Sequence, residues 1–86
     1  MTYKVELTAR VVKFLKTVPR DDKDKINERL KQISKNPRSD GVIKLSGSTN
    51  DEYRVQQGDY RIIFTINDNV LLVRVIDVNH RKDVYR

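Results

Sequence analysis

Cationic and hydrogen-bonding side chains gather in the second half of the chain, on and directly after three strand-like segments. They are Arg54, Gln56, Arg61, His80, Arg81, Tyr85 and Arg86. Arg54 and Gln56 share one face of their segment because side chains alternate along a strand, and Arg61 on the next segment can lie near them. Guanidinium groups bind phosphate oxygens two at a time. The pattern is therefore suited to holding a phosphodiester.

Cutting RNA without a metal requires more than positive charge. A group must take the proton from the attacking 2′-OH, and another must serve the leaving 5′-oxygen. Arginine does neither well in water because its pKa lies above about 12. His80 is the only side chain whose ordinary pKa lies near neutrality. It is a candidate base, and the alternative is that it braces the end of its strand and orients Arg81.

Other kinds of site are poorly supported. The chain has no cysteine and one histidine, which excludes thiolate and His-rich zinc sites. Its three glycines are scattered, so no phosphate-cradling loop is present. Taken singly, each arginine is as well explained by a solvated or salt-bridged face, and Arg74 in particular is expected to pair structurally with an acid.

Charge and hydropathy narrow the class of protein. The 86 residues carry a net charge of +6, which attracts polyanions such as nucleic acid, or an acidic protein. No apolar run approaches the roughly 20 residues that span a bilayer, and the N-terminus lacks the apolar segment of a signal peptide. We expect no membrane association. The absence of cysteine suits a cytoplasmic location.

The first half of the chain predicts one strand and two helices. Alternation over Tyr3–Leu7 indicates a half-buried strand. Thr8 can cap a helix that Pro19 ends, and Asp21 or Asp22 can cap a second helix that Asn36-Pro37 ends. The expected core positions are Val11, Leu15 and Val18 in the first helix, and Ile26, Leu30 and Ile33 in the second.

The second half predicts a sheet. Val42–Leu45 is a short strand or an extended link, and Tyr53–Gln57 is a strand that turns at Gly58-Asp59. In the next strand, alternate residues from Tyr60 face one way and those from Arg61 the other. Val70–Val78 is a nearly continuous apolar strand, as expected at the centre of a sheet.

These elements predict a single α+β domain over residues 1–86, in the order β-α-α-β-β-β. The two helices form an N-terminal αα-hairpin that packs on one face of a small, mostly antiparallel sheet. The last three strands form an antiparallel meander.

Residues 58–86, GDYRIIFTINDNVLLVRVIDVNHRKDVYR, carry the pattern GDYR…I…V…HR…VYR. In this pattern the chain resembles the RelE toxins of bacterial and archaeal toxin–antitoxin pairs. The resemblance extends over nearly the whole chain in the order of elements, and its specific motifs lie within Tyr53–Arg86. It implies a RelE-like fold with a basic cleft on the sheet.

The resemblance also implies roles for individual residues. Arg61 would contact the reactive phosphate, Arg81 would act near the leaving group, and Tyr85 would stack on a base. Arg54 and Arg86 are expected to bind substrate. Gln56 stands where such enzymes can have a basic residue, and its amide cannot take a proton.

The function implied is that of a type II toxin, a ribosome-dependent mRNA endonuclease that needs no metal or organic cofactor. Its expected partners are the ribosome, mRNA and a RelB-like antitoxin. One alternative is a ParE-like toxin, which shares the architecture and inhibits DNA gyrase by binding. Gln56 keeps that alternative open, whereas the tail HRKDVYR favours the nuclease. A non-catalytic basic nucleic-acid-binding domain is the third.

Overall fold

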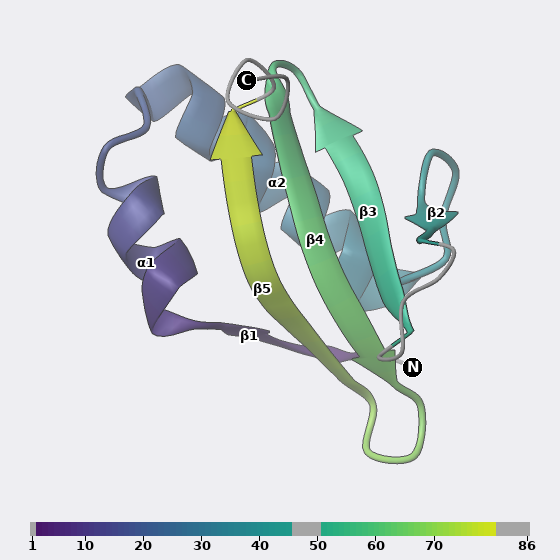
Figure 1. Ribbon diagram of the computed structural model, residues 1–86. Helices are drawn as coiled ribbons and strands as arrows, with labels where there is room; N and C mark the ends of the chain where they lie inside the picture. The colour runs from purple at the N-terminus through teal and green to yellow at the C-terminus, as the bar shows by residue number, and fades with distance from the viewer. Residues whose placement is uncertain (1, 46–50, 81–86) are drawn as a thin grey trace.

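The computed structural model describes residues 2–45 and 51–80. Its elements are β1 (Lys4–Leu7), α1 (Ala9–Leu15), α2 (Arg20–Lys35), β2 (Ile43–Lys44), β3 (Glu52–Gln57), β4 (Tyr60–Asn67) and β5 (Leu72–His80). The five strands form one sheet in the order β1-β5-β4-β3-β2. β1 runs parallel to β5, and the other pairs are antiparallel. α2 crosses one face of the sheet (Figure 1). The α+β prediction is confirmed.

One hydrophobic core lies between the helices and the sheet. The expected helix positions are all buried: Val11, Leu15, Val18, Ile26, Leu30 and Ile33. These side chains pack against buried residues of the sheet. Four of the sheet residues are fully inaccessible to solvent: Ile62, Phe64, Val73 and Val75. β4 alternates as predicted, with Tyr60, Ile62 and Phe64 buried. Neither helix within residues 2–45 and 51–80 is long and apolar enough to cross a membrane.

The predicted helix starts are partly wrong. α2 begins at Arg20 after Pro19, so Asp21 and Asp22 lie inside its first turn and do not cap it. There they favour the helix by facing the positive end of its dipole. Thr8 occupies the capping position of α1, but its side chain makes no capping hydrogen bond.

Two element boundaries also differ from expectation. α1 ends at Leu15, before Pro19, and the Thr17 hydroxyl donates to the Phe14 carbonyl at 2.7 Å in the turn that follows. β5 begins at Leu72 rather than Val70, because Leu71 adopts a left-handed backbone conformation with φ of 50°. Val70 consequently lies in the turn with 64% of its surface exposed.

β5 contains an irregularity that changes which side chains face the helices. Ile63 of β4 pairs with Asp77, and the next residue of β4, Phe64, pairs with Val75. Ile76 is therefore an extra residue of β5, between Val75 and Asp77. Strict alternation from Val75 would point Asp77 at the helices. The extra residue reverses the alternation, so that Val78 is buried and Asp77 faces away from the helices.

A polar cluster joins segments that are distant in sequence. The Tyr3 hydroxyl donates to Asp68 Oδ1 at 2.6 Å, and Arg38 donates to both Asp68 oxygens at 3.1 and 2.9 Å. The Arg38 guanidinium also lies over the Tyr53 ring, 5.7 Å from its centre. The hydrogen bonds from Arg38, and then from Tyr3, hold the pKa of Asp68 below its ordinary value.

We predict that Asp68→Asn lowers the melting temperature at neutral pH. Because the pKa of Asp68 is lowered by folding, its stabilising effect is complete above the ordinary aspartate range, near pH 4. The effect is lost as pH falls through the folded-state pKa. Thermal unfolding at several pH values should therefore show the wild-type and variant curves converging in acid. Asp51→Asn, at an exposed carboxylate beside Lys44, is the control, and equal effects at both positions would contradict this account.

Candidate functional site

The sheet face opposite the hydrophobic core, here called the open face, carries three of the predicted site residues. Its residues near the β3–β4 turn are Arg54 and Gln56 from β3, Arg61 and Ile63 from β4, and Asp77 and Asn79 from β5. They face outward because their strand neighbours Val55, Ile62 and Val78 are buried against the helices. The viewer of Figure 1 looks onto this face, with α2 behind it.

Three predicted residues are brought together on the open face. Gln56 lies directly opposite Arg61, and Arg54 lies opposite Ile63, one position along the same face. Arg54, Gln56 and Arg61 line a cavity of about 90 Å³. The Gln56 amide donates to the Gly58 carbonyl at 3.0 Å, which holds that side chain toward the turn. Within the described residues, Arg54 Nε is buried without a hydrogen-bond partner.

The loop before β2 forms one wall of this cavity, and α2 holds it in place. Arg29 on α2 donates to the Asp40 carbonyl at 2.6 Å and to the Gln32 side chain at 2.7 Å. Gly41 follows with φ of +88°, and a Cβ there would lie 3.0 Å from Arg29 Nη2. A glycine therefore satisfies both the backbone conformation and the close approach of the arginine.

His80 lies on the other face of the sheet. It pairs with Tyr60, a core residue, and the two rings meet edge to face with 5.1 Å between their centres. The Tyr60 hydroxyl donates to Asp22 at 3.5 Å, and burial, more than this carboxylate, raises the pKa of Tyr60. The structure therefore does not place the His80 ring with Arg61, although the two residues belong to neighbouring strands.

Two polar residues of the open face were not predicted from the sequence as part of the site. Asp77 and Asn79 lie beside Ile63 and Arg61, respectively, on β5. The Asn79 amide donates to Asp77 Oδ2 at 3.0 Å, and Arg10 Nε of α1 lies 3.5 Å from Asp77 Oδ1. The sequence Asp-Val-Asn could have indicated that these two polar side chains share one face of the strand. Which face that is depends on the extra residue at Ile76.

The rest of the predicted site lies beyond the described part of the chain. The residues concerned are Arg81, Tyr85 and Arg86, which fall outside residues 2–45 and 51–80. Their expected roles at the leaving group and at a base of the RNA therefore stay predictions. Within those residues no cluster of three or more histidine or carboxylate side chains could hold a metal ion. Arg74 pairs with Glu6 at 3.1 Å, which confirms its predicted structural pairing.

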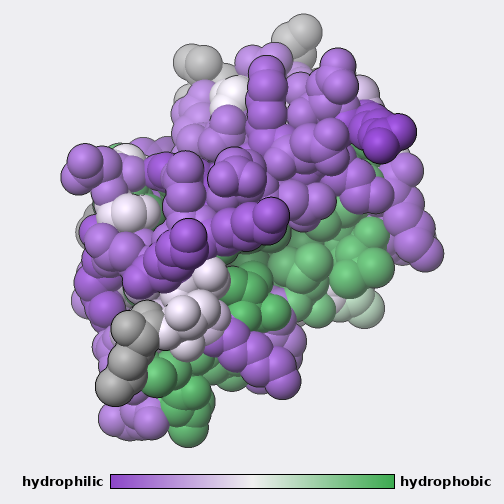
Figure 2. All heavy atoms as spheres, turned by 180° about the vertical axis from the view of Figure 1, so that it is seen from behind, coloured by the Kyte–Doolittle hydropathy of each residue, from purple (hydrophilic) through white to green (hydrophobic). Residues whose placement is uncertain are grey.

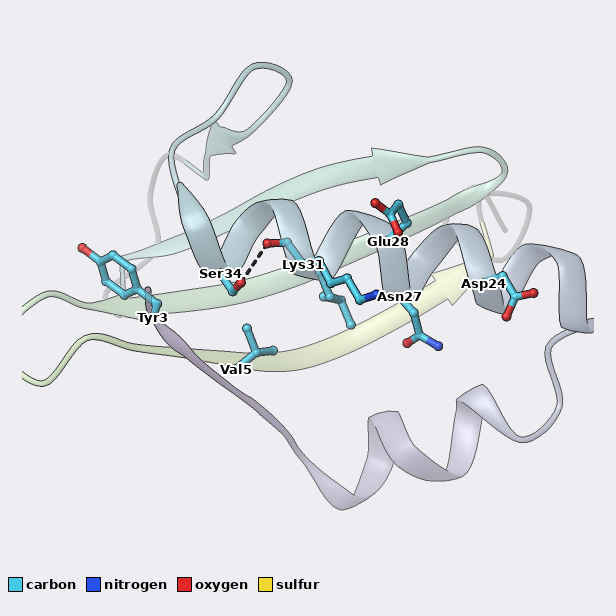
Figure 3. A pocket seen from close by; sticks show the side chains of 8 residues that line it. Tyr3, Val5, Asp24, Asn27, Glu28, Lys31 and Ser34 are labelled. Atoms are coloured by element: carbon cyan, nitrogen blue, oxygen red, sulfur yellow. Dashed lines mark hydrogen bonds between the residues drawn. The ribbon is translucent and has the colours of Figure 1, made fainter. Parts of the chain in front are cut away.

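The largest cavity described lies on the helix side, away from Arg61. It occupies about 700 Å³ between β1 and α2 and is lined by Tyr3, Val5, Asp24, Asn27, Glu28, Leu30, Lys31 and Ser34 (Figure 3). Figure 2 shows apolar surface in a hollow beside the polar outer side of the molecule on this face. The molecule thus has a groove of mixed polar and apolar lining on one face and a cationic site on the other.

Comparison with known proteins identifies the family. A family model described as the ParE toxin of the type II toxin–antitoxin system parDE matches residues 5–85. A protein named toxin RelE1 from Methanocaldococcus jannaschii is 29% identical over 91 residues, covering all of this chain and 98% of that protein.

Solved structures agree. The crystal structure of the RelE–RelB complex from Pyrococcus horikoshii matches with 32% identity and a TM-score of 0.82, over 94% of this chain and 97% of that one. The isolated RelE toxin of E. coli, at 23% identity, shares the fold with a TM-score of 0.79, over 96% of this chain and 90% of that one. The chain therefore belongs to the RelE/ParE family of toxins from type II toxin–antitoxin systems.

Proposed function

We propose that this toxin is a ribosome-dependent endonuclease that cleaves mRNA and so inhibits translation in the cytoplasm. The observation that carries the proposal is the meeting of Arg54, Gln56 and Arg61 on the open face, around a small cavity. No opposing carboxylate is paired with Arg61 in the described residues, so its guanidinium can serve a phosphate.

In the proposed reaction the 2′-OH of one nucleotide attacks the adjacent phosphate in line. Arg61 stabilises the charge that develops on the phosphate oxygens, and Arg54 binds the neighbouring backbone. Arg81 acts near the leaving 5′-oxygen, Tyr85 stacks on a base, and Arg86 adds to substrate binding. The products are a 2′,3′-cyclic phosphate or 3′-phosphate and a 5′-OH. All these roles use arginine charge in place of a metal ion.

Inhibition of DNA gyrase is the second candidate. One observation favours it: the family model that matches residues 5–85 is named for ParE. In addition, Gln56 supplies no titrating group beside Arg61. The RelE names of the similar toxin and of the similar structure above 30% identity support the nuclease instead.

An antitoxin of the RelB type is the partner that we propose for the helix side. The P. horikoshii relative is a RelE–RelB complex, and the groove between β1 and α2 offers this chain a place for an amphipathic helix, with Val5 and Leu30 for its apolar side and Glu28 and Lys31 for its polar side. Contacts from acidic antitoxin residues to the basic tail would add electrostatic attraction.

We predict that expression of the chain without an antitoxin arrests growth and translation, and that Arg61→Ala relieves the arrest. Removal of one charge-stabilising group should slow mRNA cleavage by about 10²-fold or more. The fold should persist because a partly exposed strand arginine contributes little stability. Arg74→Ala is the matched control, since Arg74 faces outward on β5 but pairs with Glu6. Full toxicity and cleavage in Arg61→Ala would contradict the site.

We predict that His80→Gln lowers stability more than activity. The edge-to-face contact with Tyr60 should contribute about 0.5–1.5 kcal/mol, which urea unfolding can measure. Single-turnover cleavage should change by only a few-fold. The base hypothesis makes the opposite prediction, a rate that falls as pH drops through roughly 6–7 and loses this dependence in His80→Gln.

We predict that association with the antitoxin slows as salt concentration rises. Long-range attraction between the basic toxin, at net charge +6, and acidic antitoxin residues is screened by salt. Stopped-flow measurements from low to high salt would show the effect on the association rate, while dissociation should change less. An association rate that is independent of salt would count against the electrostatic contribution.

A further inference from the structure

The proposed reaction lacks a proton acceptor among the residues predicted from the sequence. Gln56 has a neutral amide, and the guanidinium groups of Arg54 and Arg61 do not give up or take protons at neutral pH. The His80 ring packs on the helix side against Tyr60. Among the described residues, a base beside Arg61 would have to reach the 2′-OH from the open face.

Asp77 is a carboxylate on that face. The extra residue at Ile76 turns it away from the core and sets it opposite Ile63, while Asn79 is set opposite Arg61. Asp77 and Arg61 are therefore diagonal neighbours on adjacent strands, a relation in which residues lie about 7–8 Å apart and their Cβ atoms somewhat closer. Asp77 is thus the described carboxylate that the pairing of β4 with β5 sets beside Arg61 on the open face.

A hydrogen bond and an ion pair orient the Asp77 carboxylate from its two sides. Arg10 Nε lies 3.5 Å from Oδ1, and the Asn79 amide donates to Oδ2 at 3.0 Å. Asn79 can adopt only this amide orientation toward an ionised carboxylate, which accepts hydrogen bonds and donates none. Each carboxylate oxygen keeps a second lone pair. A base held by an orienting group is the arrangement that activates a hydroxyl nucleophile.

The carboxylate is also accessible. Its side chain is 24% exposed, and it lines a cavity of about 410 Å³ between α1 and β5. Arg10 and Lys13 of α1 border this cavity, and Arg61 and Arg54 lie across the sheet. These four cations attract the RNA backbone toward the carboxylate despite its own negative charge.

We infer that Asp77 is the general base of the cleavage reaction, an inference that rests on the nuclease function proposed above. The 2′-oxygen forms a bond to phosphorus, and its proton passes to the Asp77 carboxylate. The bond from phosphorus to the 5′-oxygen breaks, and that oxygen takes a proton from water. The products are a 2′,3′-cyclic phosphate and a 5′-OH, with Asp77 losing its proton to solvent after release.

The test is single-turnover cleavage of ribosome-bound mRNA by the full chain at several pH values. Asp77→Asn keeps the size of the side chain and an oxygen that can accept from Asn79, and it should slow cleavage by about 10²-fold or more, the usual effect of a lost general base. Binding to mRNA-loaded ribosomes should not change. The wild-type rate should exceed the Asp77→Asn rate at every pH tested. The slow Asp77→Asn rate should rise with pH as hydroxide replaces the base.

Glu6→Gln is the matched control. Glu6 is also an outward-facing carboxylate paired with an arginine, Arg74 at 3.1 Å, but it lies on β1, away from Arg61. It should cleave at the wild-type rate. If both variants behave alike, the effect of Asp77 is not specific to the site and the inference fails.

The outcomes separate this inference from the proposed function. If the wild type cleaves, Arg61→Ala does not, and Asp77→Asn cleaves at the wild-type rate, only the role of Asp77 is overturned. A slow Asp77→Asn variant whose rate stays flat with pH makes Asp77 a positioning residue and likewise overturns the base role. If the Asp77→Asn variant does not fold, Asp77→Ser takes its place in the same assay, and cleavage by Asp77→Ser at the wild-type rate overturns the base role. A wild type that cleaves no mRNA overturns both.

Discussion

The pairing of β4 with β5, with one extra residue at Ile76, is the constraint on which the site depends. β4 alternates without interruption, so its buried residues set the helix side for the whole sheet. β5 can bury both Val75 and Val78 only if it gains a residue between them. That residue turns Asp77 and Asn79 toward Arg61. The same strand therefore completes the core with one set of side chains and the polar site with the other.

This division gives the two faces different capacities. The helix side combines a close-packed core with a groove between β1 and α2 that is lined by both polar and apolar side chains. The open face instead presents cations that have few acidic neighbours, because most ion pairs in the described residues lie at its edges or in loops. Under the proposed function, the antitoxin would bind one surface and mRNA the other.

Most of the fold was predictable because long, regular patterns determine it. The buried stripes of both helices and the alternation from Tyr60 to Phe64 follow from helix and strand periods alone. The helix starts were less predictable, since Pro19 replaced the expected aspartate cap.

The site was predictable only in part. Arg54, Gln56 and Arg61 could be brought together from strand period, because β3 and β4 pair without interruption. His80 could not be placed, because its side depends on counting along β5 through the extra residue. For the same reason Asp77 was not recognised as a site residue and was counted within the apolar strand Val70–Val78. A single inserted residue moves every side chain that follows it in the strand to the opposite face of the sheet. No local pattern in the sequence predicts this insertion.

The activity itself is tested most directly by adding the purified chain to two reactions side by side. One is toeprinting of mRNA on translating ribosomes, and the other is DNA supercoiling by gyrase. The account predicts new mRNA ends in the decoding centre of the ribosome and undisturbed supercoiling. Intact mRNA together with inhibited gyrase would contradict it and would make this member of the family a gyrase inhibitor.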